Sequence, residues 1–203
     1  MDIDVVILAA GLSRRMGTSK ILLPWRGRTL LDAACEVYGD LGGNKIVVTG
    51  GEQATEAAQI ANSWGFTAVY NEAPERGQSS SLAKGIAALA NSPRPVLCAV
   101  ADQPLITQEA VRKMQKGYSV LNQDDKLILC PLYGHNKERG NPVIFGPVWK
   151  DALQQLVGDE GGRRLMRGEA KDFVQFIEIS ESIGVDVDTP FEYEQLYNRR
   201  GKI

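Results

Sequence analysis

Histidine is nearly absent from this sequence: His135 is the single histidine among 203 residues. A Ser-His-Asp hydrolase needs a histidine base, and many catalytic zinc sites use two or three histidine ligands. Either kind of site would depend on His135, which lies in a polar stretch. We therefore interpret His135 as a loop residue that forms hydrogen bonds, and the sequence disfavours both classes of enzyme.

Cysteine is also scarce, and the three cysteines are far apart (Cys35, Cys98 and Cys130). Because Cys98 and Cys130 lie within apolar stretches, we interpret them as small buried hydrophobic residues and not as disulfide or zinc partners. Asp2 and Asp4 stand where a secretory signal would be basic. No apolar run approaches the ~18 residues that a membrane span needs. The sequence predicts a cytoplasmic protein with no membrane partner.

An excess of positive charge is missing as well. Lys plus Arg number 23 against 25 Asp plus Glu, which gives a formal net charge of −2. Proteins that bind nucleic acid usually carry a basic excess, so we expect no nucleic-acid partner. A hydrophobic content of 43% with 24% charged residues is typical of a soluble globular protein and excludes disorder as the main state.

Short apolar runs alternate with amphipathic stretches in the first 120 residues. The predicted strands are Ile3–Leu8, Lys45–Thr49, Thr67–Tyr70 and Val96–Val100. The predicted helices run from Thr29 to a stop at Gly42 and Gly43, over Glu52–Ser63, over Ser79–Ala90, and from the cap Thr107 to about Val120. This alternation predicts an α/β fold in three layers, with a mostly parallel, doubly wound, Rossmann-like sheet.

The pattern is looser over 121–203. We predict strands at Leu127–Pro131, Pro142–Phe145 and Phe173–Ile179, helices at Pro147–Val157 and Phe191–Arg200, and a glycine- and arginine-rich turn at Gly161–Met166. We expect this half to extend the same sheet, so that 1–203 forms a single domain.

In open parallel sheets, ligands bind beyond the carboxyl ends of the strands. That rule directs attention to three segments that follow predicted strands: 9–20, 71–80 and 101–105. The first continues from Leu8 as L-A-A-G-L-S-R-R-M-G-T-S-K.

Two glycines in this first loop, Gly11 and Gly17, permit a backbone that points successive N–H groups at phosphate oxygens. Arg14, Arg15 and Lys20 add positive charge. An ordinary turn with solvated basic residues is the alternative. The loop matches neither the G-x-x-x-x-G-K-[ST] nor the G-x-G-x-x-G phosphate motif.

The loop and five further motifs resemble the nucleotidyltransferases of molybdenum cofactor, the MobA-like NTP transferase family, and most of all their cytidylyl branch. The further motifs are R-G-Q-S-S-S-L-A-K-G-I at 76–86, A-D-Q-P at 101–104, R-G-N-P-V-I-F at 139–145, G-D-E-G-G-R-R-L at 158–165 and D-V-D-T-P at 186–190. The resemblance implies a nucleotide-diphospho-sugar transferase-like fold, with 1–120 as the nucleotide-binding half and 121–203 as the acceptor-binding half.

The activity implied is Mg²⁺-dependent transfer of CMP from CTP to the phosphate of molybdopterin, with Mn²⁺ as a second possible metal and a molybdenum hydroxylase apoenzyme as a possible recipient. The cytidylyl branch resembles L-A-A-G and the guanylyl branch tends to carry L-A-G-G, so Ala10 favours CTP over GTP. Guanylyl or sugar-phosphate transfer on the same fold, or a non-catalytic nucleotide-binding chaperone, are the alternatives. The retained Lys20 and acidic residues argue against the last.

Nucleotidyl transfer needs groups that position and neutralise phosphates. We expect Lys20, Arg15 and Asp102 to act in catalysis. The expected nucleotide-binding residues are Leu8, Ala9, Ala10, Gly11, Arg14, Gly17, Gln78, Ser79 and Ser80. The resemblance implies that Ser80 corresponds to the serine that recognises cytosine in related cytidylyltransferases.

Mg²⁺ takes one or two carboxylates plus phosphates and water. In the family the aspartate after the fourth strand binds metal, which corresponds to Asp102, and the D-x-D-T-P region supplies a further ligand, either Asp186 or Asp188. Arg139, Asn141 and Arg163 are candidate acceptor-binding residues, with ordinary surface turns as the alternative.

Overall fold

The computed structural model describes residues 1–13, 16–122 and 124–198. One mixed sheet of eight strands runs through this part of the chain in the order β10-β7-β9-β6-β1-β4-β5, with β8 paired to β7. These strands are β1 Ile3–Ala9, β4 Gly42–Gly50, β5 Thr67–Asn71, β6 Val96–Val100, β7 Ile128–Tyr133, β8 Glu138–Arg139, β9 Val143–Phe145 and β10 Val174–Ile179.

The strand β1 lies at the centre, parallel to both neighbours, so that Ile7 stands opposite Val47 of β4 and Ala99 of β6. β4 is also parallel to β5, and β10 to β7. The exceptions are β9, which is antiparallel to β6 and β7, and β8, which is antiparallel to β7. The predicted mostly parallel sheet is confirmed.

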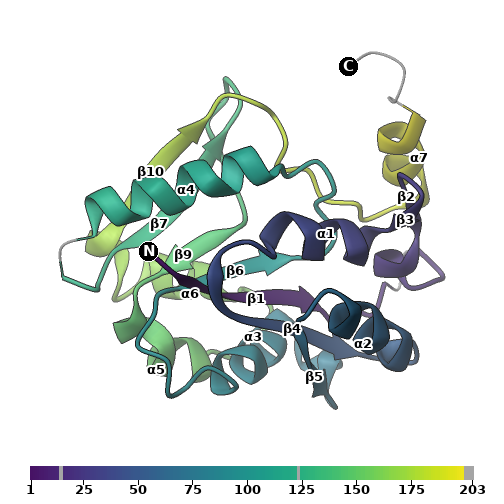
Figure 1. Ribbon diagram of the computed structural model, residues 1–203, viewed down its shortest axis with the longest axis horizontal. Helices are drawn as coiled ribbons and strands as arrows, with labels where there is room; N and C mark the ends of the chain where they lie inside the picture. The colour runs from purple at the N-terminus through teal and green to yellow at the C-terminus, as the bar shows by residue number, and fades with distance from the viewer. Residues whose placement is uncertain (14–15, 123, 199–203) are drawn as a thin grey trace.

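Helices cover both faces of the sheet (Figure 1). They are α1 Leu30–Tyr38, α2 Ala54–Ser63, α3 Gln78–Ala87, α4 Gln108–Leu121, α5 Lys150–Gln154 and α6 Gly162–Arg167. The last helix, α7 Pro190–Asn198, lies to one side beside β2 and β3, where its Leu196 packs in a separate cluster with Trp25 and Leu30. Short 3-10 turns form at η1 Lys20–Leu22, η2 Pro74–Arg76, η3 Pro147–Trp149 and η4 Lys171–Phe173, and β2 Pro24–Trp25 pairs with β3 Arg28–Thr29.

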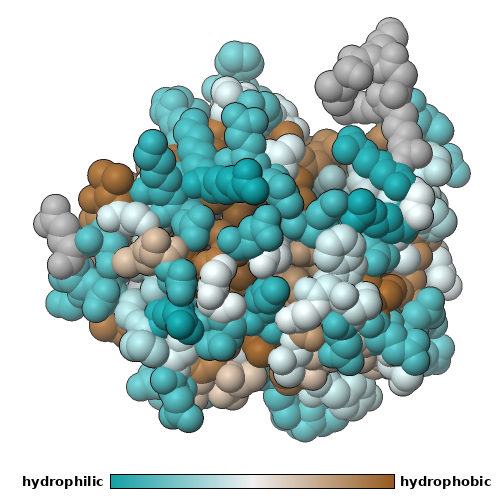
Figure 2. Space-filling view, in the orientation of Figure 1, coloured by the Kyte–Doolittle hydropathy of each residue, from teal (hydrophilic) through white to brown (hydrophobic). Residues whose placement is uncertain are grey.

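Side chains alternate across β1 and so build two cores. Ile3, Val5 and Ile7 pack in one cluster with apolar residues of α1, α2 and α4. Val6 packs in the other cluster with residues of α3, α5 and α6. Outside these clusters, Figure 2 shows a face where hydrophilic side chains predominate and hydrophobic ones are scattered among them.

The predicted helix caps agree with the structure. Thr29 begins α1 in a capping box, in which its side chain accepts from Asp32 N while the Asp32 carboxylate accepts from Thr29 N. Thr107 caps α4 by accepting from Ala110 N. Cys98 and Cys130 are free and buried, as expected, and so is Cys35.

Three predicted elements differ. Residues 161–166 were expected to be a turn, yet α6 forms there because Leu165 is buried in the second core and Gly162 packs beside Phe145. The single helix expected at Pro147–Val157 is η3 followed by α5, which ends at Gln154. β4 begins at Gly42 and not at Lys45.

The early start of β4 has a steric cause. A Cβ on Gly43 would lie 2.4 Å from the Ile3 carbonyl oxygen, so only glycine allows β4 to approach β1 this closely at its start. Within the described ranges, no helix has the length and apolar character needed to cross a membrane.

Candidate functional site

Three segments meet at the carboxyl edge of the sheet: the loop after β1, the loop after β6 and the segment before α7. Lys20 Nζ donates a 2.9 Å hydrogen bond to Asp188 Oδ1 and forms a close ion pair with Asp102 Oδ2. The Lys20 and Asp102 side chains are 14% and 16% exposed. The expected proximity of these groups is therefore present in the fold.

In the loop after β1, the side chain of Ser13 fixes the backbone of Lys20. Lys20 N donates to Ser13 Oγ at 3.0 Å, and Met16 N donates to Ser13 O at 2.9 Å. Ser13 adopts a φ of 48°, a conformation unusual for a residue other than glycine. Ser13 was not among the predicted site residues, although it lies in the quoted motif.

The segment before α7 is held by a buried valine. Val187 N donates to Asp102 O at 2.9 Å, and its side chain packs with Trp25 and Leu30. Asp186 and Asp188 flank Val187, which brings both carboxylates beside the end of β6. The Asp186 carboxylate accepts a 2.9 Å hydrogen bond from Gln103 Nε2.

The charges at this edge perturb one another. Burial and the nearby Asp102 raise the pKa of the Asp186 carboxyl above its usual 3.8, against the hydrogen bond from Gln103. Burial alone would lower the pKa of the Lys20 ammonium, but its interactions with Asp102 and Asp188 outweigh burial and raise that pKa above 10.5. Negative charge is therefore concentrated here, with Lys20 as its counter-ion.

This acidic edge suits a divalent cation. The buried Asp102 Oδ1 has no hydrogen-bond partner among the described residues, and an orphan carboxylate oxygen is available as a hard ligand. No cluster of three or more acidic, histidine or cysteine side chains poised for metal occurs within the described ranges. Since Mg²⁺ keeps phosphate and water ligands, Asp102 with Asp186 or Asp188 forms an adequate donor set.

A cleft of about 800 Å³ opens beside the acidic edge. Its lining combines the loop after β1 with the start of α3, the 158–163 segment and the acidic residues. Those lining residues are Leu8, Ala9, Ala10, Gly11, Leu12, Ser13, Lys20, Ile21, Pro74, Glu75, Gly77, Gln78, Ser81, Val100, Asp102, Asp159, Arg163 and Asp188. The cleft is large enough for a nucleotide.

The first turn of α3 is hydrogen-bonded to a segment from the second half of the chain. Gln78 N donates to Asp159 Oδ1 at 3.0 Å, and Ser79 N donates to Gly158 O at 3.0 Å. Gly77 has a φ of +93°, and a Cβ there would lie 2.6 Å from Asp159 Oδ1. Asp159 was not predicted, although the 158–165 motif contains it.

The three serines of α3 occupy different environments. Ser80 Oγ donates to Gly77 O at 2.8 Å and accepts from Asn71 Nδ2 at 2.9 Å, so its hydroxyl is engaged within the protein. Ser79 is buried. Ser81, which also accepts from Asn71 Nδ2, lines the cleft while the predicted Ser79 and Ser80 do not.

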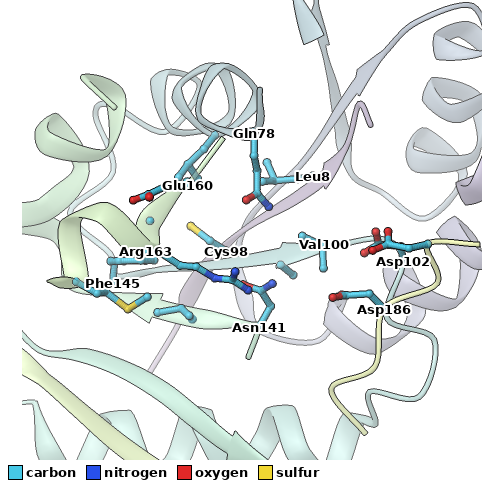
Figure 3. A pocket seen from close by; sticks show the side chains of 17 residues that line it. Leu8, Gln78, Cys98, Val100, Asp102, Asn141, Phe145, Glu160, Arg163 and Asp186 are labelled. Carbon is cyan, nitrogen blue, oxygen red and sulfur yellow. The ribbon is translucent and has the colours of Figure 1, made fainter. Parts of the chain in front are cut away.

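A second, inner cavity of about 200 Å³ continues from the cleft past Asp102 (Figure 3). Asn141 and Arg163 line it, and in Figure 3 the Arg163 side chain extends toward Asn141. Leu8, Gln78, Val100, Asp102, Arg163 and Asp188 line both spaces. Asp102 and Asp188 therefore lie where the cleft and the inner cavity meet.

The remaining predicted residues lie apart. Gly17 has the expected positive φ, 70°, but lines neither space. Arg139 lies over the Phe176 ring at 4.5 Å from its centroid, in a neighbouring cavity. Arg14 and Arg15 lie outside the described residues.

Comparison with solved structures places the fold. A Mycobacterium tuberculosis protein, Rv0371c, superposes with a TM-score of 0.83 at 28% identity over 98% of this chain and 99% of that one. Rv0371c in complex with manganese gives a TM-score of 0.79 at 25% identity over 98% and 99%. CMP:2-keto-3-deoxy-manno-octonic acid synthetase complexed with CTP, at 15% identity, a TM-score of 0.73 and coverage of 100% and 99%, shares the fold alone.

The architecture is therefore the nucleotide-diphospho-sugar transferase fold. The model of the MobA-like NTP transferase domain matches residues 5–173, and the chain belongs to that family. It is 31% identical to nicotine blue oxidoreductase of Paenarthrobacter nicotinovorans over 95% of this chain and 93% of that protein. It is 30% identical to molybdenum cofactor cytidylyltransferase of Escherichia coli over 94% and 93%.

Proposed function

We propose that the protein transfers CMP from CTP to the phosphate of a molybdopterin-type acceptor and releases pyrophosphate, with Mg²⁺ as cofactor. One observation carries the proposal: Lys20, held by Asp102 and Asp188, lies where a nucleotide-sized cleft joins an inner cavity. A donor and an acceptor that entered these two spaces would meet at that junction.

The loop after β1 supplies the phosphate contacts in this proposal. Leu8, Ala9, Ala10 and Gly11 line the cleft with backbone that a triphosphate can approach closely. Lys20 neutralises the charge that grows on the phosphates during transfer. Arg15 as a charged clamp, with Arg14 and Gly17, completes the set and remains a prediction.

The reaction needs no protein base. An acceptor phosphate oxygen attacks the α-phosphorus of CTP, a new P–O bond forms, and the bond from the α-phosphorus to the bridging oxygen breaks with release of pyrophosphate. A phosphate monoester has a second pKa near ~6, so the attacking oxygen is already ionised at neutral pH. The role of the protein is to align the groups and neutralise charge.

Asp102 with Asp186 or Asp188 would hold Mg²⁺ in this scheme. The bound ion would supply positive charge to the phosphate oxygens. Because Lys20 already contacts Asp102 and Asp188, the same carboxylates orient this lysine toward the junction.

The nucleobase preference rests on Ala10. Its methyl group is buried at the cleft wall, and a Cβ on Gly50 would lie 3.0 Å from it. Because Gly50 packs directly behind the Ala10 methyl group, this part of the cleft cannot widen. The methyl group therefore disfavours the larger purine base. Ser81, which lines the cleft at the start of α3, is better placed than Ser80 for a base edge.

The acceptor enters from the inner cavity, where Asn141 and Arg163 are available to its phosphate. The cytidylylated product is then suited to delivery to a molybdenum hydroxylase apoenzyme in the cytoplasm. The name of the Escherichia coli relative supports this acceptor.

The test is pyrophosphate release with CTP, GTP, ATP and UTP, each with Mg²⁺ and with molybdenum cofactor, a sugar phosphate or no acceptor. We expect release that requires the cofactor and is fastest with CTP. GTP preference would favour the guanylyl alternative, and sugar-phosphate dependence would favour that acceptor. Nucleotide binding without release would favour a chaperone. Turnover of nicotine blue is assayed in parallel, because one relative is named nicotine blue oxidoreductase.

A further inference from the structure

In the proposed function, the buried methyl group of Ala10 disfavours purine bases, but it does not distinguish cytosine from uracil. Cytosine carries a donor amino group at C4 beside the acceptors N3 and O2, whereas uracil carries an acceptor oxygen at C4 beside the donor N3–H. A site that prefers CTP to UTP therefore needs an acceptor that faces C4 and a donor that faces N3 or O2.

The Asp159 carboxylate lies on the wall of the cleft beside the start of α3. One of its oxygens, Oδ1, accepts from Gln78 N at 3.0 Å, which fixes the side chain against the helix. The other oxygen, Oδ2, has no hydrogen-bond or ion-pair partner in the part of the chain that the structure describes. The cleft therefore contains an anchored carboxylate with one oxygen available to an amino group.

Ser81 supplies a donor on the same helix. It is buried, it lines the cleft, and its Oγ accepts from Asn71 Nδ2 at 2.9 Å. Its own hydroxyl hydrogen has no acceptor among the described residues, so this hydrogen is available to a ligand. The Ser80 hydroxyl, in contrast, donates to Gly77 O within the protein.

The acceptor and the donor lie on one face of α3. Gln78, which holds Asp159, precedes Ser81 by three positions, and residues with this spacing on a helix have Cβ atoms about 5–6 Å apart. This separation suits the two ends of the hydrogen-bonding edge of one pyrimidine, the amino group at C4 and the oxygen O2.

The same end of the cleft contains Ala10. A Cβ on Gly50 would lie 3.0 Å from the Ala10 methyl group and 3.5 Å from Pro74 Cβ, so η2 packs beside Ala10. The chain then passes from η2 through Gly77, where a Cβ would lie 2.6 Å from Asp159 Oδ1. The methyl group that disfavours purines and the carboxylate that can accept from a base thus enclose one end of the cleft.

Glu75 is the other carboxylate at this end of the cleft. It is exposed, and no hydrogen bond or ion pair fixes its side chain among the described residues. Ordering a free glutamate on a base costs side-chain entropy. Asp159 is already held by Gln78 N, so it is better suited to recognise a base.

On the basis of the proposed function, we propose that Asp159 is a specificity-determining residue, whose Oδ2 accepts from the 4-amino group of cytosine while the Ser81 hydroxyl donates to O2. With UTP, the carboxylate would face the C4 oxygen of uracil, and two acceptors without a proton between them repel each other. The second half of the chain would thus take part in the choice of nucleotide as well as in the binding of the acceptor.

The kinetic test is Asp159→Asn. Asparagine keeps an oxygen for Gln78 N but places an NH₂ group toward the base, where it donates to uracil and no longer accepts from cytosine. With molybdenum cofactor as acceptor, the ratio of kcat/KM for CTP to kcat/KM for UTP should fall at least about tenfold. The ratio does not depend on the fraction of enzyme that is folded.

Glu75→Gln is the matched control, because it neutralises the other carboxylate at this end of the cleft and should leave the ratio unchanged. An unchanged ratio in Asp159→Asn, or an equal fall in Glu75→Gln, would overturn Asp159 as the residue that selects cytosine.

A binding test distinguishes failure of this inference from failure of the proposed function. Calorimetric titration with CTP and with UTP, each with Mg²⁺ and without acceptor, should show a preference for CTP that Asp159→Asn reduces about tenfold. This shift without any CMP transfer would overturn the proposed function and support Asp159 as a base-recognising residue. CMP transfer with the same preference in wild type and variant would support the function and overturn the inference. Absence of binding of either nucleotide to wild type would overturn both.

Discussion

Lys20 and Asp188 are 168 residues apart in the chain, and Lys20 Nζ donates a 2.9 Å hydrogen bond to Asp188 Oδ1. The same ammonium group contacts Asp102. The contact joins the loop after the first strand to the segment that precedes the last helix. It holds a compact positive charge between two carboxylates at the mouth of the cleft.

Replacement of Lys20 by Met should lower kcat for pyrophosphate release by about 10² or more, because a preorganised charge at the phosphates is lost. Lys116→Met, on the exposed face of α4, is the control and should retain wild-type rates. Steady-state assays with CTP measure both. Wild-type kcat in the Lys20 variant would exclude Lys20 from catalysis.

Asp102→Asn should lower the Mg²⁺-dependent rate by about 10² or more, because a carboxylate ligand is lost. Asp40→Asn, in an exposed pair with Arg112, should have no effect. Rates are measured across a range of Mg²⁺ concentrations, and circular dichroism checks that both variants fold. An unchanged Mg²⁺ dependence in folded Asp102→Asn would remove Asp102 from the metal site.

Ala10→Gly should increase the use of GTP relative to CTP, since the buried methyl group narrows the base end of the cleft. The quantity to measure is the ratio of kcat/KM for the two nucleotides in each protein. General damage to the fold lowers both values and leaves the ratio unchanged. A ratio equal to that of wild type would exclude Ala10 as a base-selecting residue.

Asp32→Ala should destabilise the fold by about 1 to 2 kcal/mol at pH 7, because it removes the capping box of α1. The Asp32 carboxylate also accepts from Trp64 Nε1 at 2.8 Å. Burial acts to raise the pKa of this carboxyl, but hydrogen bonds from Thr29 and Trp64 outweigh it and lower the pKa below 3.8.

A lowered folded-state pKa gives this effect a definite pH dependence. The carboxylate stabilises the fold fully above the unfolded pKa of about 3.9 and loses this contribution as pH falls through the folded-state pKa. The difference in unfolding free energy between wild type and variant should therefore shrink below about pH 4, as urea denaturation can measure. Glu36→Gln, in an exposed pair on the same helix, should change stability by less than about 1 kcal/mol.

Lys150→Ala should cost about 3 kcal/mol of stability, because the buried Asp4 carboxylate loses its buried ion-pair partner and keeps only a 3.8 Å contact with Arg94 and the hydrogen bonds from Asn44. Lys150 Nζ donates to Asp4 Oδ2 at 3.3 Å and to Ser92 O at 2.8 Å, and Lys150 and Asp4 are 4% and 0% exposed. Lys84→Ala, in an exposed pair with Glu72, should cost less than about 1 kcal/mol. Similar urea midpoints for the two variants would contradict the structural role of Lys150.

Much of the fold could be predicted from local signals. Continuous apolar runs indicate strands buried on both faces, and Thr29 and Thr107 mark helix starts by their capping chemistry. The carboxyl-edge rule brought Lys20 and Asp102 to one place because both follow central strands. Asp186 and Asp188 were expected there from the resemblance.

The remaining features depend on tertiary contacts that local sequence does not encode. α6 forms in a stretch rich in glycine and arginine because Leu165 is buried between neighbouring elements. Asp159 approaches α3 from 81 residues away, and only the fold brings it to Gln78 N. Asn71 Nδ2 donates to the hydroxyls of both Ser80 and Ser81, but only the Ser80 hydroxyl also bonds to backbone carbonyls, those of Ala73 and Gly77, which local sequence does not reveal.

The place of β9 has a consequence for shortened versions of the chain. This strand comes from the second half of the sequence, yet its backbone pairs with β6 on one side and with β7 on the other. Deletion of all residues after 120 would leave one edge of β6 without a paired strand. It would also remove Asn141, Val143 and Phe145 from the lining of the inner cavity. A fragment that keeps every residue of the loop after β1 would therefore still have an incomplete binding site. Its unpaired β6 edge would also be free to pair with a second copy of the fragment.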